Sequence, residues 1–435
     1  MTLNGAHSDA QHPEAFLLYG SNKVLTRYPE LYQALRERGL KPLVITEPVE
    51  RAGRLPEFIG DTSHPLSDIA AVGYHERGDL DGILDTVASW RAEYSIVGGF
   101  SIGEYFVGPS IVVNDYLGFP SPGLRAGQVC RNKHLQRLYL EEFSPNSRMI
   151  APDQREDFLA SREVQSGIVK PVGRNSSSGV YPFSSVEELR EQIQTYQEDE
   201  ILLIEQHVSG NEVSVESLVQ GGEVIFTGVT QKFVGEGFVE IGHEFPADLP
   251  EAQTRALVET NKEILHRLAF QDGISHAEYK IDPSGKVYLI EIAARFPGDS
   301  IMGLYNLATG ESLATAIVDI ALGRTVTYPT PARFAKQVFV VPPPGILSEV
   351  STTGDLGTEV SWSDKTWMWP LLIEADADTP ATLRVIMCDK SVGDTVTSLE
   401  SSADRVLSFV VDAPTRHDLL DIAKSVEASV VVKTV

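Results

Sequence analysis

The chain has 435 residues, with 36 Lys and Arg against 61 Asp and Glu, which gives a formal net charge of −25. Hydrophobic residues make up 42% and charged residues 22%, an ordinary globular composition that argues against a disordered chain. The length indicates two to four domains or one large multi-lobed enzyme. Because an acidic surface repels phosphate backbones, we expect no nucleic-acid partner, and a bound nucleotide must be held by a local cationic pocket.

The cysteine count and the hydropathy pattern predict where in the cell the protein is located. Cys130 and Cys388 cannot build a disulfide framework, so the reducing cytoplasm is the expected location. No apolar run approaches the ~18 residues that span a bilayer, and we expect no membrane partner. The first 15 residues are polar and lack an apolar core segment, so they predict a loose leader and not a secretory signal.

The first 120 residues have the pattern of an α/β lobe. Strands are predicted at 16–19, 43–46 and 95–99, and helices at 31–39 and 102–117. The order of strand, glycine turn, helix and strand is typical of a parallel, Rossmann-like sheet. Pro120 and Pro122 then break the chain, which predicts an N-terminal domain over residues 1–120.

The rest of the chain predicts an α+β middle region over residues 121–325 and a β-rich C-terminal domain over residues 326–435. In the middle region, helices are predicted at 131–143, 186–196, 253–268 and 312–322, and strands at 167–172, 201–204, 212–219, 224–230 and 287–290. The C-terminal part contains a Pro-rich turn at 342–345 and several short β-like segments. The predicted fold class is therefore α/β and α+β with several lobes.

Two lysines and a loop of small residues are candidate phosphate contacts. Lys170 ends a predicted apolar strand, where an anion would stabilise its ammonium, and Lys133 lies in the basic helix at 131–143. Small residues let backbone N–H groups approach phosphate oxygens, although such a stretch is more often a plain turn and a lone lysine is usually solvated. No Gly-Lys-Ser/Thr closes the loop, so it is not a Walker A loop. The loop residues are Asn175, Ser176, Ser177, Ser178 and Gly179.

The strand at 201–204 leads into a short polar linker. Glu205, Gln206 and Val208 follow the strand, and Glu212 comes seven residues after Glu205. A strand that leaves its sheet in this way can offer backbone groups to a purine edge, and the later carboxylate can reach a ribose diol. Taken alone, the two glutamates are more simply explained as acids at strand ends.

Glu278 and Glu291 are separated by 13 residues, with the turn 282–285 between them. This spacing suits two adjacent antiparallel strands, so both carboxylates are predicted to point to one side. Hard oxygen ligands in such a pair hold Mg²⁺ against the phosphates of a nucleotide. Arg295 would stabilise charge on a transferring phosphoryl group. The simpler alternative is a surface hairpin with an ordinary salt bridge.

In this order, the motifs from residue 129 to residue 323 resemble the ATP-grasp superfamily. The flanking lobes fit its N-terminal α/β domain and its C-terminal extension, and the lid subdomain falls at about 145–203. The resemblance implies ATP and two Mg²⁺ ions as cofactors. It implies that Lys133, Lys170 and the loop 175–179 contact the phosphates of ATP. It also implies that Glu205, Gln206 and Val208 bind the adenine and that Glu212 binds the ribose. Glu278 and Glu291 are then the implied metal ligands. Many members have Asn two residues after the second metal glutamate; Ala293 stands there in this chain, so a second Mg²⁺ must draw on another group.

Two further segments, 238–247 and 291–299, look like those of L-amino-acid ligases of the bacilysin-synthetase type. There a Glu-x-x-His element and an arginine line the acyl-phosphate site, which implies Glu240, His243 and Arg295 as catalytic residues. Glu240 can hold a metal or a substrate ammonium, and His243 can hydrogen-bond a phosphate or an amine, although a satisfied loop histidine is a simple alternative. Gly298 and Asp299 are the implied substrate-binding residues. The small acidic side chain of Asp299 would leave more room for the second substrate or would select a cationic group on it.

The resemblance implies ATP-dependent ligation of a carboxylic acid to an amine through an acyl phosphate, with small-molecule acid and amino-acid substrates. A dipeptide or a peptide-like antibiotic intermediate is the implied product. Two alternatives stay open: a biotin-carboxylase-like or purine-pathway enzyme on the same scaffold, and a non-catalytic ATP-binding protein. A homodimer is common on this scaffold, but the sequence does not identify the residues of an interface.

Overall fold

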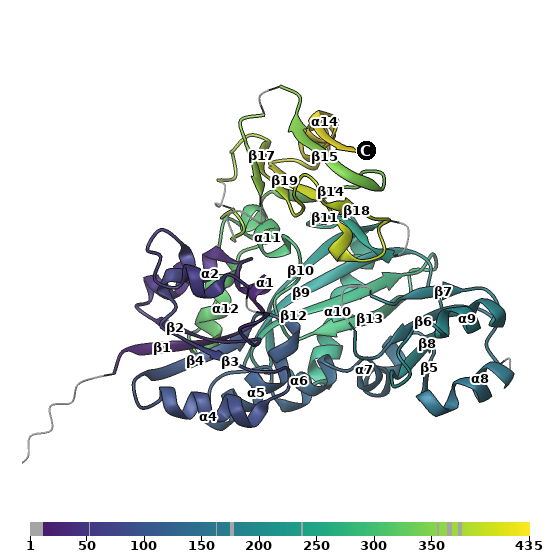
Figure 1. Cartoon of the computed structure of the whole chain (residues 1–435), viewed down its shortest axis with the longest axis horizontal. Coiled ribbons are helices and arrows are strands. Elements are labelled where there is room, and N and C mark those ends of the chain that lie inside the picture. The colour runs from purple at the N-terminus through teal and green to yellow at the C-terminus, as the bar shows by residue number, and fades with distance from the viewer. Residues whose placement is uncertain are drawn as a thin grey trace, which may run out of the picture.

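The computed structural model describes residues 12–51, 53–161, 163–174, 178–235, 238–354, 356–362, 368–372 and 376–435. Figure 1 shows a purple to blue N-terminal lobe, a teal lobe and a green to yellow C-terminal lobe around the central strands β9, β10, β12 and β13. In the described ranges, no helix is long and apolar enough to cross a membrane.

The N-terminal lobe is a parallel sheet between two layers of helices. Its strands are β1 (Glu14–Tyr19), β2 (Lys41–Thr46), β3 (Ala71–Tyr74) and β4 (Ser95–Ser101), in the order β3-β2-β1-β4. The central strands are buried on both faces, as in other parallel sheets. Helices α4 (Leu80–Trp90) and α5 (Val107–Leu117) cover one face, and α2 (Pro29–Glu37) and α12 (Leu313–Ala321) cover the other. Helix α12 comes from the middle of the chain, so the N-terminal lobe is completed by a distant segment. The lobe also contains α1 (Asn22–Leu25) and α3 (Leu55–Phe58).

A small antiparallel sheet occupies the segment predicted as a lid subdomain. Its strands are β5 (Ser147–Ile150), β8 (Leu202–Glu205), β6 (Gly167–Pro171) and β7 (Tyr181–Phe183), in the order β5-β8-β6-β7. Helices α8 (Arg155–Ser161) and α9 (Val186–Ile193) pack on it through one apolar cluster. Lys170 and Glu205 are therefore neighbours on adjacent strands of this sheet.

A nine-stranded sheet links the middle of the chain to the C-terminal lobe, in the order β13-β12-β9-β10-β11-β14-β19-β17-β16. Strand β14 pairs with β11, so the sheet runs through the boundary expected at residue 325. Helices α6, α7 and α10 pack on the β9-β12-β13 part, and α11 packs on the opposite face. The bounds are β9 (Asn211–Gln220), β10 (Glu223–Val234), β11 (Glu240–Phe245), β12 (Gly273–Ile281), β13 (Val287–Ala293), β14 (Phe334–Val340), β16 (Val360–Trp362), β17 (Thr382–Cys388), β19 (Leu407–Ala413), α6 (Leu124–Cys130), α7 (Lys133–Tyr139), α10 (Glu251–Arg267) and α11 (Ile301–Thr309).

The β-rich character predicted for the C-terminal lobe is confirmed. A second sheet of β18 (Thr395–Val396), β15 (Gly345–Thr352) and β20 (Val430–Thr434) accompanies the end of the long sheet, and α14 (Arg416–Ser429) packs with them around one apolar cluster. A helix in this lobe was not predicted from the sequence.

The helix predicted at 131–143 is shorter in the structure. Helix α7 begins after Asn132, whose side chain accepts hydrogen bonds from the backbone N–H groups of His134 and Leu135. It ends at Tyr139, and a separate 3₁₀ turn follows at Glu141–Phe143. The capping asparagine therefore fixes where Lys133 enters the helix.

Arg333 anchors the C-terminal lobe and is only 1% exposed. Its guanidinium contacts the Asp412 carboxylate at 2.5 Å and donates to the carbonyls of Asp376, Ala377 and Thr379. Arg384 holds the other oxygen of Asp412. One buried cation thus ties the start of β14 to β19 and to the segment at 376–379.

We expect Arg333→Met to lower the free energy of unfolding of the C-terminal lobe by about 3 kcal/mol, since it leaves buried carbonyls and part of a buried carboxylate unpaired. Arg324→Met is the matched control, because Arg324 forms an exposed pair with Asp319, and such a pair contributes at most about 1 kcal/mol. Urea unfolding of both variants measures the difference. Equal losses in the two would contradict the anchoring role.

Candidate active site

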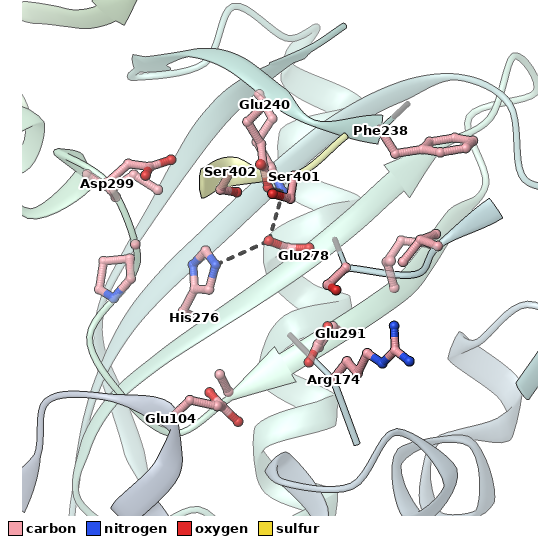
Figure 2. Close-up of a pocket in the computed structure, with 18 of the residues that line it drawn as sticks. Glu104, Arg174, Phe238, Glu240, His276, Glu278, Glu291, Asp299, Ser401 and Ser402 are labelled. Carbon is pink, nitrogen blue, oxygen red and sulfur yellow. Dashed lines mark hydrogen bonds and ion pairs between the residues drawn. The ribbon is translucent and has the colours of Figure 1, made fainter. Parts of the chain in front are cut away.

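A cavity of about 580 Å³ lies where the three lobes meet. Figure 2 shows Glu278 and Glu291 on neighbouring strands of its floor, with Glu240, Asp299, Ser401 and Ser402 along another part of the wall. Gly179 does not line the cavity, and Asn175, Ser176 and Ser177 lie outside the described residues. The predicted site residues that line it are Lys133, Lys170, Ser178, Glu205, Gln206, Val208, Glu212, Glu240, His243, Glu278, Glu291, Arg295, Gly298 and Asp299.

The two glutamates predicted as metal ligands lie opposite each other. Strands β12 and β13 are antiparallel, and Glu278 is the direct register partner of Glu291. The turn between the strands is closed by the Asp282 carboxylate, which accepts from the backbone N–H groups of Ser284 and Lys286. The predicted hairpin geometry is confirmed, and both carboxylates line the cavity.

These carboxylates are neutralised by two lysines. Lys133 Nζ lies 3.0 Å from Glu291 Oε1. Lys232 Nζ lies 2.7 Å from Glu278, 3.1 Å from Glu212 and 3.2 Å from Glu240. Burial lowers the pKa of Lys232, but the three carboxylates together raise it well above its ordinary value. Lys232 was missed because the strand was predicted to end at residue 230, whereas β10 continues to Val234.

The other predicted phosphate lysine is paired at the lid sheet. Lys170 Nζ contacts Glu205 Oε2 at 2.6 Å, and Arg137 Nε contacts Glu205 Oε1 at 2.5 Å. Both oxygens of the Glu205 carboxylate are therefore engaged by cations. Burial lowers the pKa of Lys170 despite the attraction of Glu205. Arg137 follows Lys133 by four residues on α7, a helical spacing that could have indicated it.

A buried network supports Glu278 from behind. Glu216 is 1% exposed, and its carboxylate contacts His276 Nδ1 at 2.7 Å, Tyr305 at 2.6 Å and Thr230 at 2.7 Å. The other ring nitrogen of His276 lies 3.4 Å from Glu278. Although burial lowers the pKa of His276, its hydrogen bonds to Glu216 and Glu278 raise it to about 9. A protonated imidazole thus holds Glu278 in place.

Arg295 is tied to the N-terminal lobe. Its Nε lies 2.6 Å from the Glu104 carboxylate, which also contacts Arg131. Burial raises the pKa of Glu104, but the two arginines outweigh it and hold the value at about 2. Glu104 precedes α5 in the N-terminal lobe, 191 residues before Arg295 in the chain, so no local spacing could have paired them.

Asp299 and Glu240 share a cation from the C-terminal lobe. The guanidinium of Arg405 contacts Asp299 Oδ1 and Glu240 Oε2, each at 2.8 Å. His243 Nε2 contacts the other oxygen of Asp299 at 2.8 Å. Burial raises the pKa of Asp299, but Arg405, His243 and Arg27 hold it well below its ordinary value. The idea that Asp299 selects a cationic substrate group therefore loses support, because its charge is already balanced.

The backbone around Asp299 opens the cavity. Asp299 has φ of +52°, in the left-handed region that is costly for a residue with a side chain. A Cβ built on Gly298 meets no heavy atom within 4 Å, so the space beside it is open. The strained conformation aims the Asp299 carboxylate at His243 and Arg405.

The residues fit a magnesium ion that is held partly by a nucleotide. Glu278 and Glu291 supply carboxylate oxygens, the ligands that Mg²⁺ prefers. In the part of the chain that the structure describes, no group of three or more His, Cys, Asp or Glu could form a complete metal cage. A Mg²⁺ ion bound by this pair would take its other ligands from phosphates and water, the usual arrangement in nucleotide sites.

Comparisons with known proteins agree with this geometry. Residues 165–302 match the family model of the ATP-grasp domain. The L-amino acid ligase from Bacillus licheniformis superposes with a TM-score of 0.74 at 17% identity, over 98% of this chain and all of that one. The biotin carboxylase domain of the Hydrogenobacter thermophilus 2-oxoglutarate carboxylase, solved with MgADP and bicarbonate, superposes with a TM-score of 0.65 at 13% identity, over 97% of this chain and 91% of that one. The chain therefore has the ATP-grasp fold, as predicted.

Within that class, the sequence is similar to amino-acid ligases. The alanine–anticapsin ligase of Bacillus subtilis is 21% identical over 290 residues, which cover 60% of this chain and 61% of that protein. The relative from Bacillus amyloliquefaciens gives the same identity and coverage. The match thus spans about three fifths of the length of these curated relatives.

We expect Glu104→Gln to destabilise the protein by about 3 kcal/mol at pH 7, since a pKa held near 2 against an unfolded value near 4.5 links ionisation to folding. This contribution is complete above about pH 4.5 and is lost as the pH falls towards 2. Urea unfolding should show that the difference in free energy of unfolding between wild type and variant becomes smaller over that pH range. Two results would contradict the ion-pair account. One is a difference in free energy of unfolding that stays constant from pH 7 to pH 3, and the other is an equal difference in Glu93→Gln, which alters an exposed residue.

We expect His276→Asn to weaken binding of Mg-ADP about tenfold, because partners behind a metal ligand commonly contribute that much. Binding of ADP without Mg²⁺ should change little, whereas a general loss of structure would weaken both. Calorimetric titration with and without Mg²⁺ separates the two effects. His266→Asn on the exposed side of α10 is the control, and equal Mg-ADP affinity in all three proteins would refute the role.

Proposed function

We propose that the protein is an ATP-dependent ligase that joins a carboxylic acid to an amine through an acyl phosphate, releasing ADP and phosphate. The proposed acid is an amino acid or a similar molecule, and the proposed amine is an L-amino acid. The observation that carries the proposal is the register pair Glu278 and Glu291, which faces Lys133, Lys232 and Arg295 in one cavity. A mere nucleotide binder has little use for so complete a set of charges around a phosphoryl group.

The nucleotide is proposed to lie against the lid sheet. Lys133 and Lys170 would contact its phosphates, with Ser178 at the edge of the same cavity. The backbone of Gln206 and Val208 would receive the adenine, with Glu205 held by Lys170. Glu212, which contacts Lys232 and Lys280, would face the ribose.

Two Mg²⁺ ions, held by Glu278, Glu291 and the phosphates, would supply charge neutralisation. The chain's own residues do the positioning. In the first step, a carboxylate oxygen of the acid attacks the γ-phosphorus, and the bond to the β-phosphate oxygen breaks to release ADP. Arg295 would balance the charge that develops on the phosphoryl oxygens.

In the second step, the amine attacks the carbonyl carbon of the acyl phosphate. The C–N bond forms, the bond from carbon to the phosphate oxygen breaks, and the proton that the amine loses passes to the departing phosphate or to water. We assign His243 to orient the incoming amine, since it lines the cavity and its ring is held in place by the contact of its Nε2 with Asp299. Glu240 lies beside it, where a substrate ammonium would compete for the carboxylate with Arg405 and Lys232.

The relatives support an amino-acid product. A ligase named for alanine and anticapsin, and another named for L-amino acids, share this fold or sequence. A dipeptide or a peptide-like antibiotic intermediate is therefore the proposed product. A homodimer is proposed as well, supported by the neighbour described as a domain dimer.

The test is ADP release from Mg-ATP with L-amino acids offered singly and in pairs. We expect release that requires two partners, with a product whose mass is the sum of both less water. Release that requires bicarbonate instead would favour a carboxylase. ATP binding with no ADP formation for any acceptor would favour a non-catalytic protein.

We expect Glu291→Gln to lower this ADP release at least a hundredfold, since it removes a metal-ligand charge opposite Glu278. Glu198→Gln, on an exposed loop after α9, is the matched control and should keep full activity. The measurement is the steady-state rate at saturating Mg-ATP. Activity of Glu291→Gln within a few-fold of the control would show that the metal assignment is wrong.

A further inference from the structure

One wall of the cavity is built from residues that no proposed nucleotide contact uses. Lys23 and Arg27 come from the α1 region of the N-terminal lobe, and Asp389 and Arg405 come from the C-terminal lobe. The two lobes touch there, because the backbone N–H of Trp369 donates to the carbonyl of Thr26 at 2.8 Å. The guanidinium of Arg27 lies over the Trp369 ring, 5.0 Å from its centre.

Two cations on this wall differ from all the others in the cavity. In the described ranges, seven of its lysines and arginines form an ion pair with a carboxylate, whereas Lys23 and Arg27 form none. The seven paired residues are Lys133, Lys170, Arg174, Lys232, Lys280, Arg295 and Arg405.

Buried N–H donors point to the same place. The Nε atoms of Arg27 and Arg405 are buried without a hydrogen-bond partner in the described structure, and Arg405 as a whole is only 6% exposed. An unsatisfied buried donor is costly, and such groups in native proteins call for an explanation. A buried Nε is out of reach of a ligand, but the two Nη atoms of Arg27 are not among these buried atoms and form no hydrogen bond within the described residues, so they are the donors open to an anionic ligand in the cavity.

We propose that Lys23 and Arg27, backed by Arg405, form a subsite for the carboxylate of the amine-donating substrate. This inference rests on the proposed ligase function and adds the group by which its second substrate is recognised. The α-amine and the carboxylate of an amino acid share one carbon, so the groups that bind them must be close together. His243 is assigned to the amine, and Asp299, which contacts His243 Nε2 at 2.8 Å, also contacts Arg405 on the same wall.

The local charges favour a monoanion. Arg405 contacts two carboxylates, those of Asp299 and Glu240, and Asp389 is a further acid near Lys23. With Lys23 and Arg27, these groups sum to a net charge of zero, three cations against three carboxylates, so a carboxylate brings less repulsion to this wall than a doubly charged phosphate ester. Lys23 is exposed, but the pKa of its ammonium is lowered by partial desolvation and by Arg27, while Asp389 and Asp299 oppose this. A bound carboxylate would relieve the repulsion between the two cations.

The test compares an L-amino acid with its carboxamide as the amine donor. For wild type, we expect kcat/KM to be at least tenfold higher with the acid. Arg27→Gln and Lys23→Gln should each raise KM for the amino acid about tenfold and abolish most of this preference. KM for Mg-ATP and for the carboxamide should stay unchanged. Arg36→Gln, on the exposed side of α2, is the control, and Arg27→Lys should recover part of the preference.

Three outcomes would overturn the subsite. The first is a preference of wild-type size in both Gln variants, and the second is equal use of the amino acid and its carboxamide by wild type. The third is a raised KM for the carboxylic-acid substrate that is phosphorylated, with no change in KM for the amine donor. If no pair of substrates gives a product, the ligase proposal fails first. The subsite is then tested by calorimetric binding of the amino acid and its carboxamide to the protein with Mg-ADP. Equal affinities, or no binding of either compound, would overturn it independently of turnover.

Discussion

The site depends on the balance between the carboxylates that line the cavity and the cations that neutralise them. Glu278, Glu291 and Glu205 lie among apolar strands, where an unpaired charge would be unstable, and each is held by a lysine or by a lysine and an arginine. Two of these lysines, Lys133 and Lys170, are those proposed to contact ATP. The folded protein therefore holds the carboxylates in position before any nucleotide arrives.

Ion pairs of this kind also join the lobes. Arg295 binds Glu104 of the N-terminal lobe, and Arg405 of the C-terminal lobe binds Glu240 and Asp299 of the middle region. Two features set the relative positions of these partners. One is the continuous sheet from β13 to β16, and the other is the packing of α12 on the N-terminal sheet. The cavity is thus a property of the whole chain, since each lobe supplies charged residues that the others balance.

Sequence reasoning reached the parts of the site that depend on local geometry. The register of Glu278 with Glu291 follows from two strands and one short turn, and Lys170 follows from the end of an apolar strand. Glu104 and Arg405 were missed because their partners are 191 and 106 residues away. Pairing over such distances is set by tertiary packing, which leaves no spacing in the chain to detect. The α/β, α+β and β-rich regions were predicted, whereas the sheet that crosses two of them was not.

The most direct test of the account is the fate of oxygen from the acid substrate. With ¹⁸O in both carboxylate oxygens, activation by the γ-phosphate predicts that one label appears in the released phosphate for each bond formed. Mass spectrometry of phosphate and product measures the transfer. Phosphate without label, alongside a ligated product, would contradict an acyl phosphate and with it the roles proposed for Arg295 and the glutamate pair.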